Sequence, residues 1–527
     1  MHGRSHLRPC LVALAACLLV ACEPPAPAPF EPDAVEQIPG SKEPPRIHEV
    51  YSPCTLPDGL SEGDVPPVDL DDPESVFGDG GLPLFDIRFP PGAWEEACEN
   101  AKYVADWMKA RRHGDAPATI TRPVVRVDVF IQGRALYDVG FRFRGQSNLF
   151  AMFYDRWTRP RAGALQACKT DRMAKKASYR IVLDEFVPGR RVAGQRAFDF
   201  AGREGSDAAY LREVTAQHVA REFGLPAPLV GHARVCRDGE YDGLFTLAEE
   251  ADFRGLPRRL FPGESEGGYW EVVAPSSQAW EPEWTDSEGW QVVYDAVKPT
   301  SDTDIGRLGL LLDAGDIARA GGVPSGLDEL IDVDAWLRNI ALDMVIPDYD
   351  GMMGNHKNHA LYDHPTRGLL PISYDKDIAF VDLGSYQYGL CAGSIWGANP
   401  CWSSRTEPPE LAGHLLQTQP QEYLARVQEL VDGPLDPTTL IPWLHARRDA
   451  IRPWVAADRY YQPDGPACDS DPDFCQWYTP GAWEYEALLL EMNIETRLIE
   501  VRRQLEGQHD CVQSCMDPPF PWLVDGY

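Results

Sequence analysis

Basic residues are scarce in this sequence. Its 527 residues include 49 lysines and arginines against 81 aspartates and glutamates, which gives a formal net charge of −32. The phosphate backbone of a nucleic acid and an anionic membrane surface both repel such a charge, so we expect neither as an electrostatic partner. A nucleotide remains possible as a ligand, because it requires only a local basic pocket.

Several other sequence signals are absent. There is no GxGxxG loop, so the sequence does not predict a glycine-rich cradle for phosphates. There is no CxxC…CxxC pattern and no cysteine–histidine spacing typical of structural zinc. His356 and His359 lie three residues apart without a glutamate or third ligand nearby in the sequence, and we interpret them as loop histidines. No repeat of solenoid period is present.

Apolar runs long enough to suggest a membrane segment are also lacking, apart from a short one at the N-terminus. Residues 1–21 carry basic residues and then an apolar run, and the tetrapeptide LVAC ends at Cys22. The run is too short for a spanning helix, and the pattern is that of a bacterial lipoprotein signal, with Cys22 acylated as the new N-terminus. An ordinary signal peptide cleaved elsewhere is the alternative. Both interpretations place the protein in the cell envelope or at the cell surface, outside the cytoplasm.

The cysteine count fits an oxidising compartment. Of the 13 cysteines, Cys10 and Cys17 leave with the signal and Cys22 takes the lipid, so ten remain and five disulfides are possible. Short separations favour three pairs, Cys391–Cys401, Cys468–Cys475 and Cys511–Cys515. Four cysteines are left without a predicted pairing: Cys54, Cys98, Cys168 and Cys236.

Proline and acidic residues dominate residues 22–81. Their low apolar content predicts a flexible tether that holds the folded part away from the membrane. The folded part is predicted to begin at residue 82, and the length suffices for one large or two medium domains. Residues 148–174 have the composition of an irregular insertion.

A predicted hairpin with acidic residues on both sides lies within residues 346–380. Two short apolar runs, HALYD and GLLPISYD, are joined by a turn at residues 364–368. Four aspartates flank the hairpin, Asp348 and Asp350 before it, and Asp375 and Asp377 after it. Folding the hairpin would bring both pairs to one side, where carboxylates and the amide of Asn358 would form a hard-oxygen site for Mg²⁺.

A predicted helix precedes the first pair of aspartates. Apolar residues recur at helical spacing after Asp334, a plausible N-cap, and the helix ends at Pro347. Helix, acidic loop, hairpin and metal-binding aspartate is the order found in the C-terminal lobe of a protein kinase. There one aspartate accepts the hydroxyl proton, and an asparagine and a second aspartate hold metal on the phosphates. A solvated acidic turn is the simpler interpretation of either pair alone.

This stretch resembles the CotH kinase family, which are atypical kinases of the spore-coat type. The matching features are Asp350, Asn358, the HALYD run and the YDKD run that ends at Asp377. The family usually has tryptophan in place of Tyr374, and His-Asn-Tyr where this chain has Lys-Asn-His around Asn358. The resemblance spans roughly residues 82–508.

The resemblance also implies roles in the N-terminal part. The family's Arg-Gly-x-Ser signature falls on Arg144 to Ser147, either of which would reach the nucleotide. A lysine at the head of a strand falls on Lys176, and the helix glutamate that pairs with this lysine in kinases falls on Glu213. Glu249 lies where a kinase passes from its small to its large lobe and would face adenine or ribose. On pattern alone, these residues are a tight turn, a solvated lysine and surface acids.

The expected fold class is α+β, a two-lobed, atypical protein-kinase-like fold. A β-rich N-lobe is predicted over residues 82–250 and a mostly helical C-lobe over residues 251–508, followed by a tail over residues 509–527.

The implied function is ATP-dependent phosphorylation of a hydroxyl on another exported protein, with Mg²⁺ or Mn²⁺ as the metal. Asp350 would be the catalytic residue. Asn358 and Asp375 would hold the metal, while Asp348 and Asp377 are reserves for these roles.

Several alternatives stay open. ATP is scarce outside the cytoplasm, so the chain could be an inactive pseudokinase or a structural envelope lipoprotein. A calcium loop beginning at Asp348 would need a glutamate at its twelfth position, where the sequence has His359. A DxD phosphatase is disfavoured because its aspartate should follow a strand rather than a helix. A glycosidase with two carboxylates is not excluded, because sequence alone does not give their separation.

Overall fold

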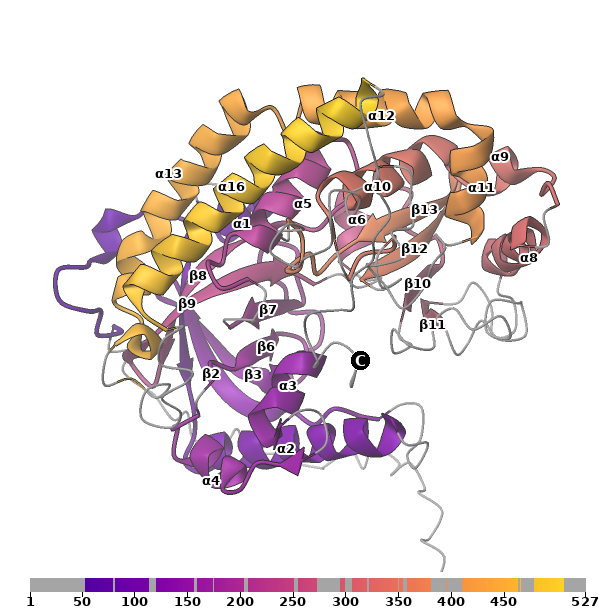
Figure 1. Ribbon diagram of the computed structural model, residues 1–527. Helices are drawn as coiled ribbons and strands as arrows, with labels where there is room; N and C mark the ends of the chain where they lie inside the picture. Colours follow the sequence, from indigo (N-terminus) through magenta and orange to yellow (C-terminus); the bar gives the residue numbers. More distant parts are fainter. Residues whose placement is uncertain are drawn as a thin grey trace, which may run out of the picture. The chain divides into compact units, whose positions relative to one another are not determined.

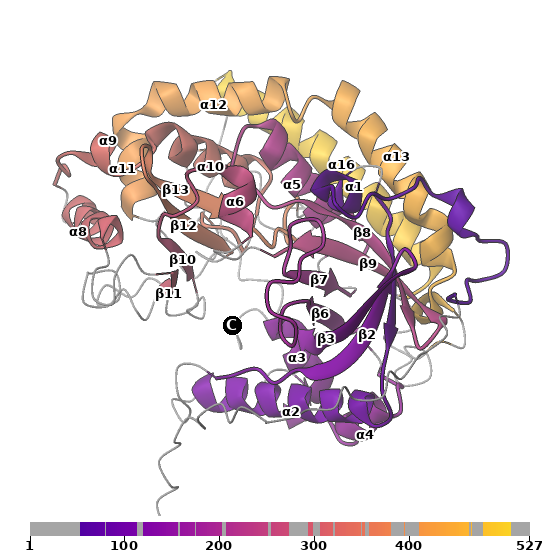
Figure 2. The same ribbon diagram turned by 180° about the vertical axis from the view of Figure 1, so that it is seen from behind.

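The structure is a computed structural model, shown in Figures 1 and 2. It describes residues 53–78, 81–112, 120–155, 159–173, 175–202, 207–250, 255–272, 294–298, 306–319, 322–348, 350–353, 358–380, 395, 410–462, 465 and 478–506. Cys22, the predicted signal, the C-terminal tail and the cysteines of the three short-range pairs lie outside these residues. Within the described ranges, no helix combines the length and the apolar character needed to cross a membrane.

Seven strands form a closed barrel in the order β1-β2-β3-β6-β7-β9-β8. The strands are β1 (Leu84–Arg88), β2 (Val125–Ile131), β3 (Arg134–Arg144), β6 (Ser178–Val182), β7 (Ala197–Ala201), β8 (Val230–Arg237) and β9 (Glu240–Glu249). Neighbouring strands are antiparallel except β1 and β8, which run parallel. The pairs β2–β3 and β8–β9 are hairpins. Their turn residues Gln132-Gly133 and Asp238-Gly239 all have positive φ, as two-residue hairpin turns require.

Alternation along the strands separates an aromatic core from a polar face. On β3, Phe141 and Phe143 are buried, while Arg142 and Arg144 between and after them are partly exposed. Phe141 packs against Tyr179 with ring centroids 5.3 Å apart. This pattern leaves the arginines of β3 on the face opposite the aromatic core.

The prediction of a flexible tether over residues 22–81 is wrong for its last part, because residues 53–78 are folded against the barrel. Cys54 forms a disulfide with Cys236 on β8. Helix α1 (Pro73–Phe77) buries Phe77 completely against Phe198, with ring centroids 5.7 Å apart. Residues 53–78 therefore belong to the folded part, because a disulfide and a few buried side chains fix a segment whose composition is otherwise that of a linker.

The predicted irregular insertion contains short elements. These are α3 (Gln146–Phe153), β4 (Tyr154–Asp155), β5 (Arg159–Pro160) and α4 (Ala164–Lys169). They pack with the long helix α2 (Ala93–Arg112) beside the barrel (Figure 1). The Cys98–Cys168 disulfide joins α2 to α4, and the indole of Trp94 donates to the Cys168 carbonyl at 2.9 Å.

A second sheet has four strands in the order β11-β10-β12-β13. The strands are β10 (Tyr269–Val272), β11 (Tyr294–Lys298), β12 (His359–His364) and β13 (Gly368–Ser373). The β12–β13 hairpin is the one predicted from the acidic stretch. The predicted helix before the acidic loop is α10 (Val333–Val345), which packs on β13, but its N-cap is Asp332 rather than Asp334. The side chain of Asp332 accepts from the Ala335 amide at 2.9 Å.

Helices connect the barrel to the second sheet. The remaining helices are α5 (Arg212–Glu222), α6 (Leu256–Leu260), α8 (Arg307–Arg319), α9 (Leu327–Leu330), α11 (Glu410–Thr418), α12 (Pro420–Asp432), α13 (Pro437–Ala456) and α16 (Pro480–Leu505), with 3-10 turns η1 (Glu62–Asp64) and η3 (Arg459–Tyr461). In both views α13 and α16 lie side by side (Figures 1 and 2). One apolar core runs through α5, α10, α12, α13 and α16, including Ile340, Leu430, Trp454 and Leu490. The fold is thus α+β, as predicted, with a closed barrel in its β-rich part and a sheet among its C-terminal helices.

Candidate functional site

Charged residues form a row across three strands of the barrel. Arg142 on β3 is the cross-strand neighbour of Arg180 on β6, and Arg180 is the neighbour of Asp199 on β7. The Arg180 Nε donates to Asp199 Oδ1 at 2.5 Å, and Arg144 Nε lies 3.6 Å from the same oxygen. Burial opposes ionisation of Asp199, but Arg144 and Arg180 outweigh it and lower the pKa of this carboxyl to about 2. The row is therefore ionised and rigidly paired at its Asp199 end.

Arg144 links this row to residues from other elements. Burial alone would lower its pKa, but Asp199, Asp375 and Glu213 together raise it. Asp375 follows β13 of the second sheet, and Glu213 lies in the first turn of α5. The structure thus brings two predicted site residues, Glu213 and Asp375, within electrostatic reach of a third, Arg144.

Asn358 and Asp375 are held together by the backbone. Asn358 Nδ2 donates to the Asp375 carbonyl at 2.8 Å, and the Tyr374 amide donates to the Asn358 carbonyl at 3.1 Å. Both Asn358 and Asp375 have positive φ, 50° and 53°, which is uncommon for residues other than glycine and recurs at functional sites. Because the Asn358 NH₂ group is used as a donor, its Oδ1 is the atom suited to binding a metal.

A buried ion cluster is centred on Lys376, the residue that follows Asp375. Lys376 Nζ donates to Asp343 Oδ1 at 2.7 Å and to Asp348 Oδ2 at 2.6 Å. All three side chains are buried. Asp343 is near the end of α10, so Lys376 joins the helix, the acidic loop and the strand end that carries Asp375. Lys376 lies between Asp375 and Asp377, so its ion pair with Asp348 connects the chain segment after the hairpin to the acidic loop before it.

The charges in this cluster do not balance, because two carboxylates share one ammonium. Burial raises the pKa of Asp348 to about 6, with further contributions from Asp343 and Asp350 and opposition from Lys376. Burial would lower the pKa of Lys376, but the two carboxylates raise it above its usual value. Gly351 borders the cluster, and a Cβ added there would lie 2.5 Å from Asp348 Oδ2, so the loop requires glycine at this position. Asp348 is consequently a structural partner of Lys376.

Asp350 is partly buried in the same loop. Its carboxylate is close enough to raise the pKa of Asp348. It therefore lies on a loop that Lys376 anchors beside Asp375.

Lys176 does not lie in this site. Its ammonium donates to the Leu244 carbonyl at 2.5 Å and to Asp458 Oδ2, and it lies over the Phe245 ring, 3.9 Å from the centroid. Burial lowers its pKa, although Asp458 opposes this. The predicted Lys176–Glu213 pair is therefore wrong. The physical reason is that Lys176 precedes β6, so the alternation that directs Arg180 toward the site does not extend to it.

Glu249 is also bound by protein groups. Its carboxylate accepts from Arg259 Nη2 at 2.6 Å, from Gln195 Nε2 at 2.7 Å and from the Leu229 amide at 2.9 Å. The next residue, Glu250, contacts the charged row instead, accepting from Arg180 Nη1 at 2.9 Å.

Sequence reasoning missed Arg180 and Asp199. Each stands between two buried apolar residues of a short strand, as in Tyr179-Arg180-Ile181 and Phe198-Asp199-Phe200. A charge at the centre of such a strand is the signal that could have identified them, because it must face a polar site.

Among the described residues, no group of three or more histidine, cysteine, aspartate or glutamate side chains could hold a metal by itself. A kinase-type Mg²⁺ needs fewer protein ligands, since it binds one or two carboxylates together with substrate phosphates and waters. The Asp375 carboxylate, which is exposed, and the Asn358 amide oxygen fit this requirement.

Comparison with known proteins gives one family. The family model described as CotH kinase protein matches residues 141–472. No curated protein matches the chain. Among solved structures, the chain is similar to HipA of Shewanella oneidensis MR-1, solved with HipB and its operator DNA as a toxin–antitoxin system. That match has 13% identity and a TM-score of 0.28, and it covers 62% of this chain and 66% of that chain, slightly under two thirds. The family match spans more than half of the chain and includes Arg144, Glu213, Asp350, Asn358 and Asp375. The chain therefore belongs to the CotH kinase protein family.

Proposed function

We propose that this protein transfers the γ-phosphate of ATP to a hydroxyl of another exported protein. In this proposal the barrel serves as the small lobe of a kinase, and the second sheet with its helices serves as the large lobe. The observation that carries the proposal is the position of Arg144 within reach of both Asp375 and Glu213. A cation from one sheet and a carboxylate that follows the other are the parts that hold phosphates and metal in a kinase.

Arginine takes the phosphate-binding role in this proposal. Lys176 is sealed by Asp458, whereas Arg144 and Arg180 lie on the site face. A guanidinium can donate two parallel hydrogen bonds to phosphate oxygens and keeps its charge when partly buried. Glu213 orients Arg144 as the helix glutamate of other kinases orients their lysine.

The Asp375 carboxylate and the Asn358 amide oxygen would hold Mg²⁺ or Mn²⁺. When bound, the metal would neutralise charge on the nucleotide phosphates. The hydrogen bond from Asn358 to the Asp375 backbone keeps these two ligands together before metal arrives.

Asp350 orients the acceptor hydroxyl and takes its proton as the new O–P bond forms and the bond from the γ-phosphorus to the bridging oxygen breaks, so that ADP leaves. Lys376 contributes by positioning, because it fixes Asp348 and with it the loop that carries Asp350. Most of the rate enhancement then comes from orientation and charge neutralisation.

Export and a lipid anchor at Cys22 remain part of the proposal. The Cys54–Cys236 and Cys98–Cys168 disulfides support it, since disulfides persist in oxidising compartments. The sealed Lys176 favours a second candidate, a pseudokinase that binds ATP without transferring phosphate.

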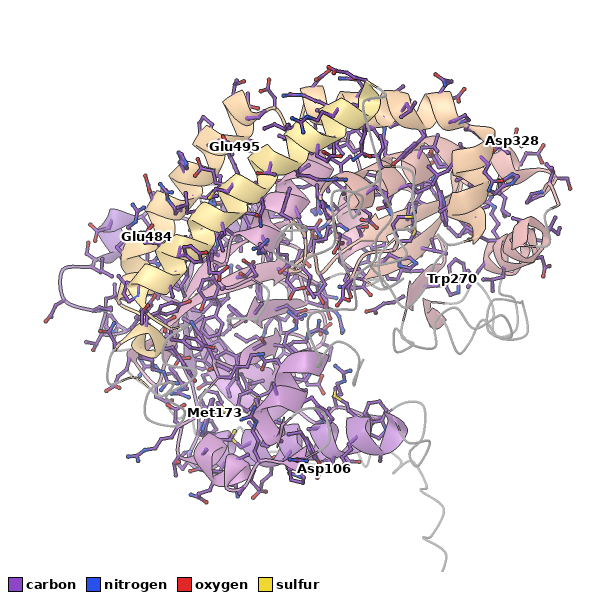
Figure 3. The ribbon with its side chains drawn as sticks, in the orientation of Figure 1. Asp106, Met173, Trp270, Asp328, Glu484 and Glu495 are labelled. Carbon is purple, nitrogen blue, oxygen red and sulfur yellow. A yellow bond between two sulfur atoms is a disulfide. The ribbon has the colours of Figure 1, made fainter. Side chains whose placement is uncertain are left out.

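One experiment tests both candidates. The mature chain carrying Cys22→Ser is incubated with labelled ATP, Mg²⁺ or Mn²⁺ and casein. We expect label on casein, reduced at least about a hundredfold by Asp350→Asn or Asp375→Asn. Asp328→Asn, on the exposed surface of α9 (Figure 3), is the matched control and should keep full activity. An ATP-dependent rise in melting temperature without transfer would establish the pseudokinase, and neither response would contradict both candidates.

A further inference from the structure

A pocket beside the charged row has no role in the proposed phosphate transfer. It lies between α2, α3 and β3. Most of its lining is apolar and comes from Ala97, Ala101, Val104, Pro123, Phe141, Phe143 and Leu149. Its polar members are Asn100, Arg122 and Arg142, so the charged groups at the pocket are two cations and no carboxylate.

Arg142 is the clearest sign that something is missing from this pocket. Its Nη1 atom is buried and finds no hydrogen-bond partner within the described part of the chain. Burial, Arg180 and Arg122 lower the pKa of Arg142 to about 9, and Asp199 only partly opposes them. A buried donor without an acceptor is costly, and each such group in a native fold calls for an explanation.

Arg122 adds a second cation at the pocket rim. Its side chain is exposed to solvent, yet surrounding protein and Arg180 lower its pKa. Arg122 lines the same pocket as Arg142. In a chain whose net charge is −32, a concave site with an excess of arginines is a specific feature rather than average surface.

The nearby carboxylate is already used. Asp199 pairs with Arg180 and Arg144, and its charge opposes the effect of burial on Arg142 only in part. Asp375 and Glu213 are among the charges that act most strongly on Arg144 but not among those that act most strongly on Arg142. Arg142 precedes Arg144 by two residues on β3, which places it about 7 Å farther along the strand. About 7 Å is also the distance between successive side chains on one face of an extended peptide. An acceptor residue at the phosphate and metal ligands could therefore have a neighbouring side chain at Arg142.

We propose that Arg122 and Arg142 form an anion subsite that binds a carboxylate or phosphate group of the acceptor protein, close to the hydroxyl that is phosphorylated. This inference rests on the proposed function and deepens it by naming the acceptor class. The bound group is an aspartate, a glutamate or a phosphoserine beside the acceptor serine. The overall negative charge of the protein repels an acidic acceptor, so the subsite supplies the local attraction that recognition needs.

The test measures peptide binding, which does not depend on catalysis. Fluorescent peptides with one serine flanked by glutamates, by phosphoserines or by glutamines are titrated into the Cys22→Ser chain, and anisotropy is recorded. We expect the glutamate or phosphoserine peptide to bind at least about tenfold more tightly than the glutamine peptide. Arg142→Gln and Arg122→Gln should each remove most of that preference. Arg134→Gln, an exposed arginine at the other end of β3, should leave it unchanged.

Folding and nucleotide binding are measured on the same variants. Because Nη1 of Arg142 lacks a partner, Arg142→Gln should melt at or above the wild-type temperature and keep the wild-type affinity for ATP. Equal binding of acidic and neutral peptides by the wild type would overturn the subsite. Loss of ATP affinity in Arg142→Gln with the peptide preference intact would also overturn it and assign the arginine to the nucleotide. A preference for acidic peptides that depends on Arg142, in a chain with no transfer activity, would uphold the subsite and reject the kinase proposal.

Discussion

Lys176 and Lys376 are both fully buried and both bind aspartate, yet their surroundings move their pKa values in opposite directions. Burial lowers the pKa of Lys176; Asp458, which contacts it, and Asp242 oppose this, while Arg459 adds to it. Lys376 faces Asp343 and Asp348, and their combined charge raises its pKa despite burial. The two ammonium groups differ in their direct partners: Lys376 contacts two carboxylates, whereas Lys176 contacts one and has the Arg459 guanidinium nearby.

The two lysines also connect different parts of the fold. Lys176 and Asp458 are separated by 282 residues, and their pair fastens the segment around η3 to the barrel. Lys376 fastens the acidic loop to α10 and to the strand end with Asp375. Lys176 matches the family signature, yet it makes a structural ion pair away from the site. Lys376 is not a predicted site residue, yet it holds the loop with Asp350 beside Asp375.

The largest effect is expected from Lys376→Met. It leaves two buried carboxylates without their ammonium, and breaking a buried ion pair on one side costs about 3–5 kcal/mol of unfolding free energy. Phosphate transfer should fall at least about tenfold, because the Asp350 loop loses its anchor. Urea unfolding and labelled-ATP transfer measure the two effects. Adding Asp343→Asn and Asp348→Asn to this variant should restore most of the stability, and failure to do so would contradict the charge argument.

A smaller loss is expected from Lys176→Met. Asp458 keeps hydrogen bonds from the Tyr460 amide at 2.9 Å and the Leu244 amide at 3.1 Å, so its carboxylate is not left alone. We expect a loss of about 2–3 kcal/mol in unfolding free energy and an unchanged ATP-induced rise in melting temperature. A folded variant whose melting temperature no longer rises with ATP would show that Lys176 takes part in nucleotide binding. That result would contradict the structural role assigned to Lys176.

The smallest effect concerns pH and Asp348. The folded-state pKa of about 6 lies above the ordinary value of about 4 for an unfolded aspartate. The folded protein therefore binds a proton that the unfolded chain does not, so this stabilisation is present below about pH 4 and is lost as the pH rises through about 6. The loss should be on the order of 2 kcal/mol.

Comparing urea unfolding of the wild type and Asp348→Asn isolates this contribution. The difference between their unfolding free energies should change between about pH 4 and pH 6 and be flat above about pH 7. The pKa of Asp199, lowered to about 2, works in the other direction, since its stabilisation is lost only as the pH falls toward 2. A difference curve that is flat across the whole range would show that Asp348 titrates normally.

Local signals predicted the local parts of this fold. The turn at residues 364–368 predicts the β12–β13 hairpin, which Asn358 and Asp375 flank. The apolar spacing after Asp334 predicts the helix that is α10. In each case the residues that decide the structure are close in sequence.

Contacts between distant segments were not predictable in the same way. The partner of Lys176 lies beyond the second sheet in the chain, and no pattern near either residue reports it. Closure of the barrel by the parallel β1–β8 pair and the burial of Phe77 likewise depend on tertiary packing. The proximity of Arg144 to Asp375 was expected only from the family resemblance, since hydrophobic periodicity gives the face of a strand but not what lies opposite it.

The disulfide between Cys54 and Cys236 has a mechanical consequence. In the proposed lipid-anchored form, tension on the chain between Cys22 and Cys54 would pass to β8 through the Cys54–Cys236 disulfide. The segment containing α1, which follows Cys54, would then carry little of this tension. Residues 23–53 span at most about 110 Å when fully extended. In that proposed form, this length and the size of the folded part would together limit the distance from the attachment point at which an acceptor could be reached.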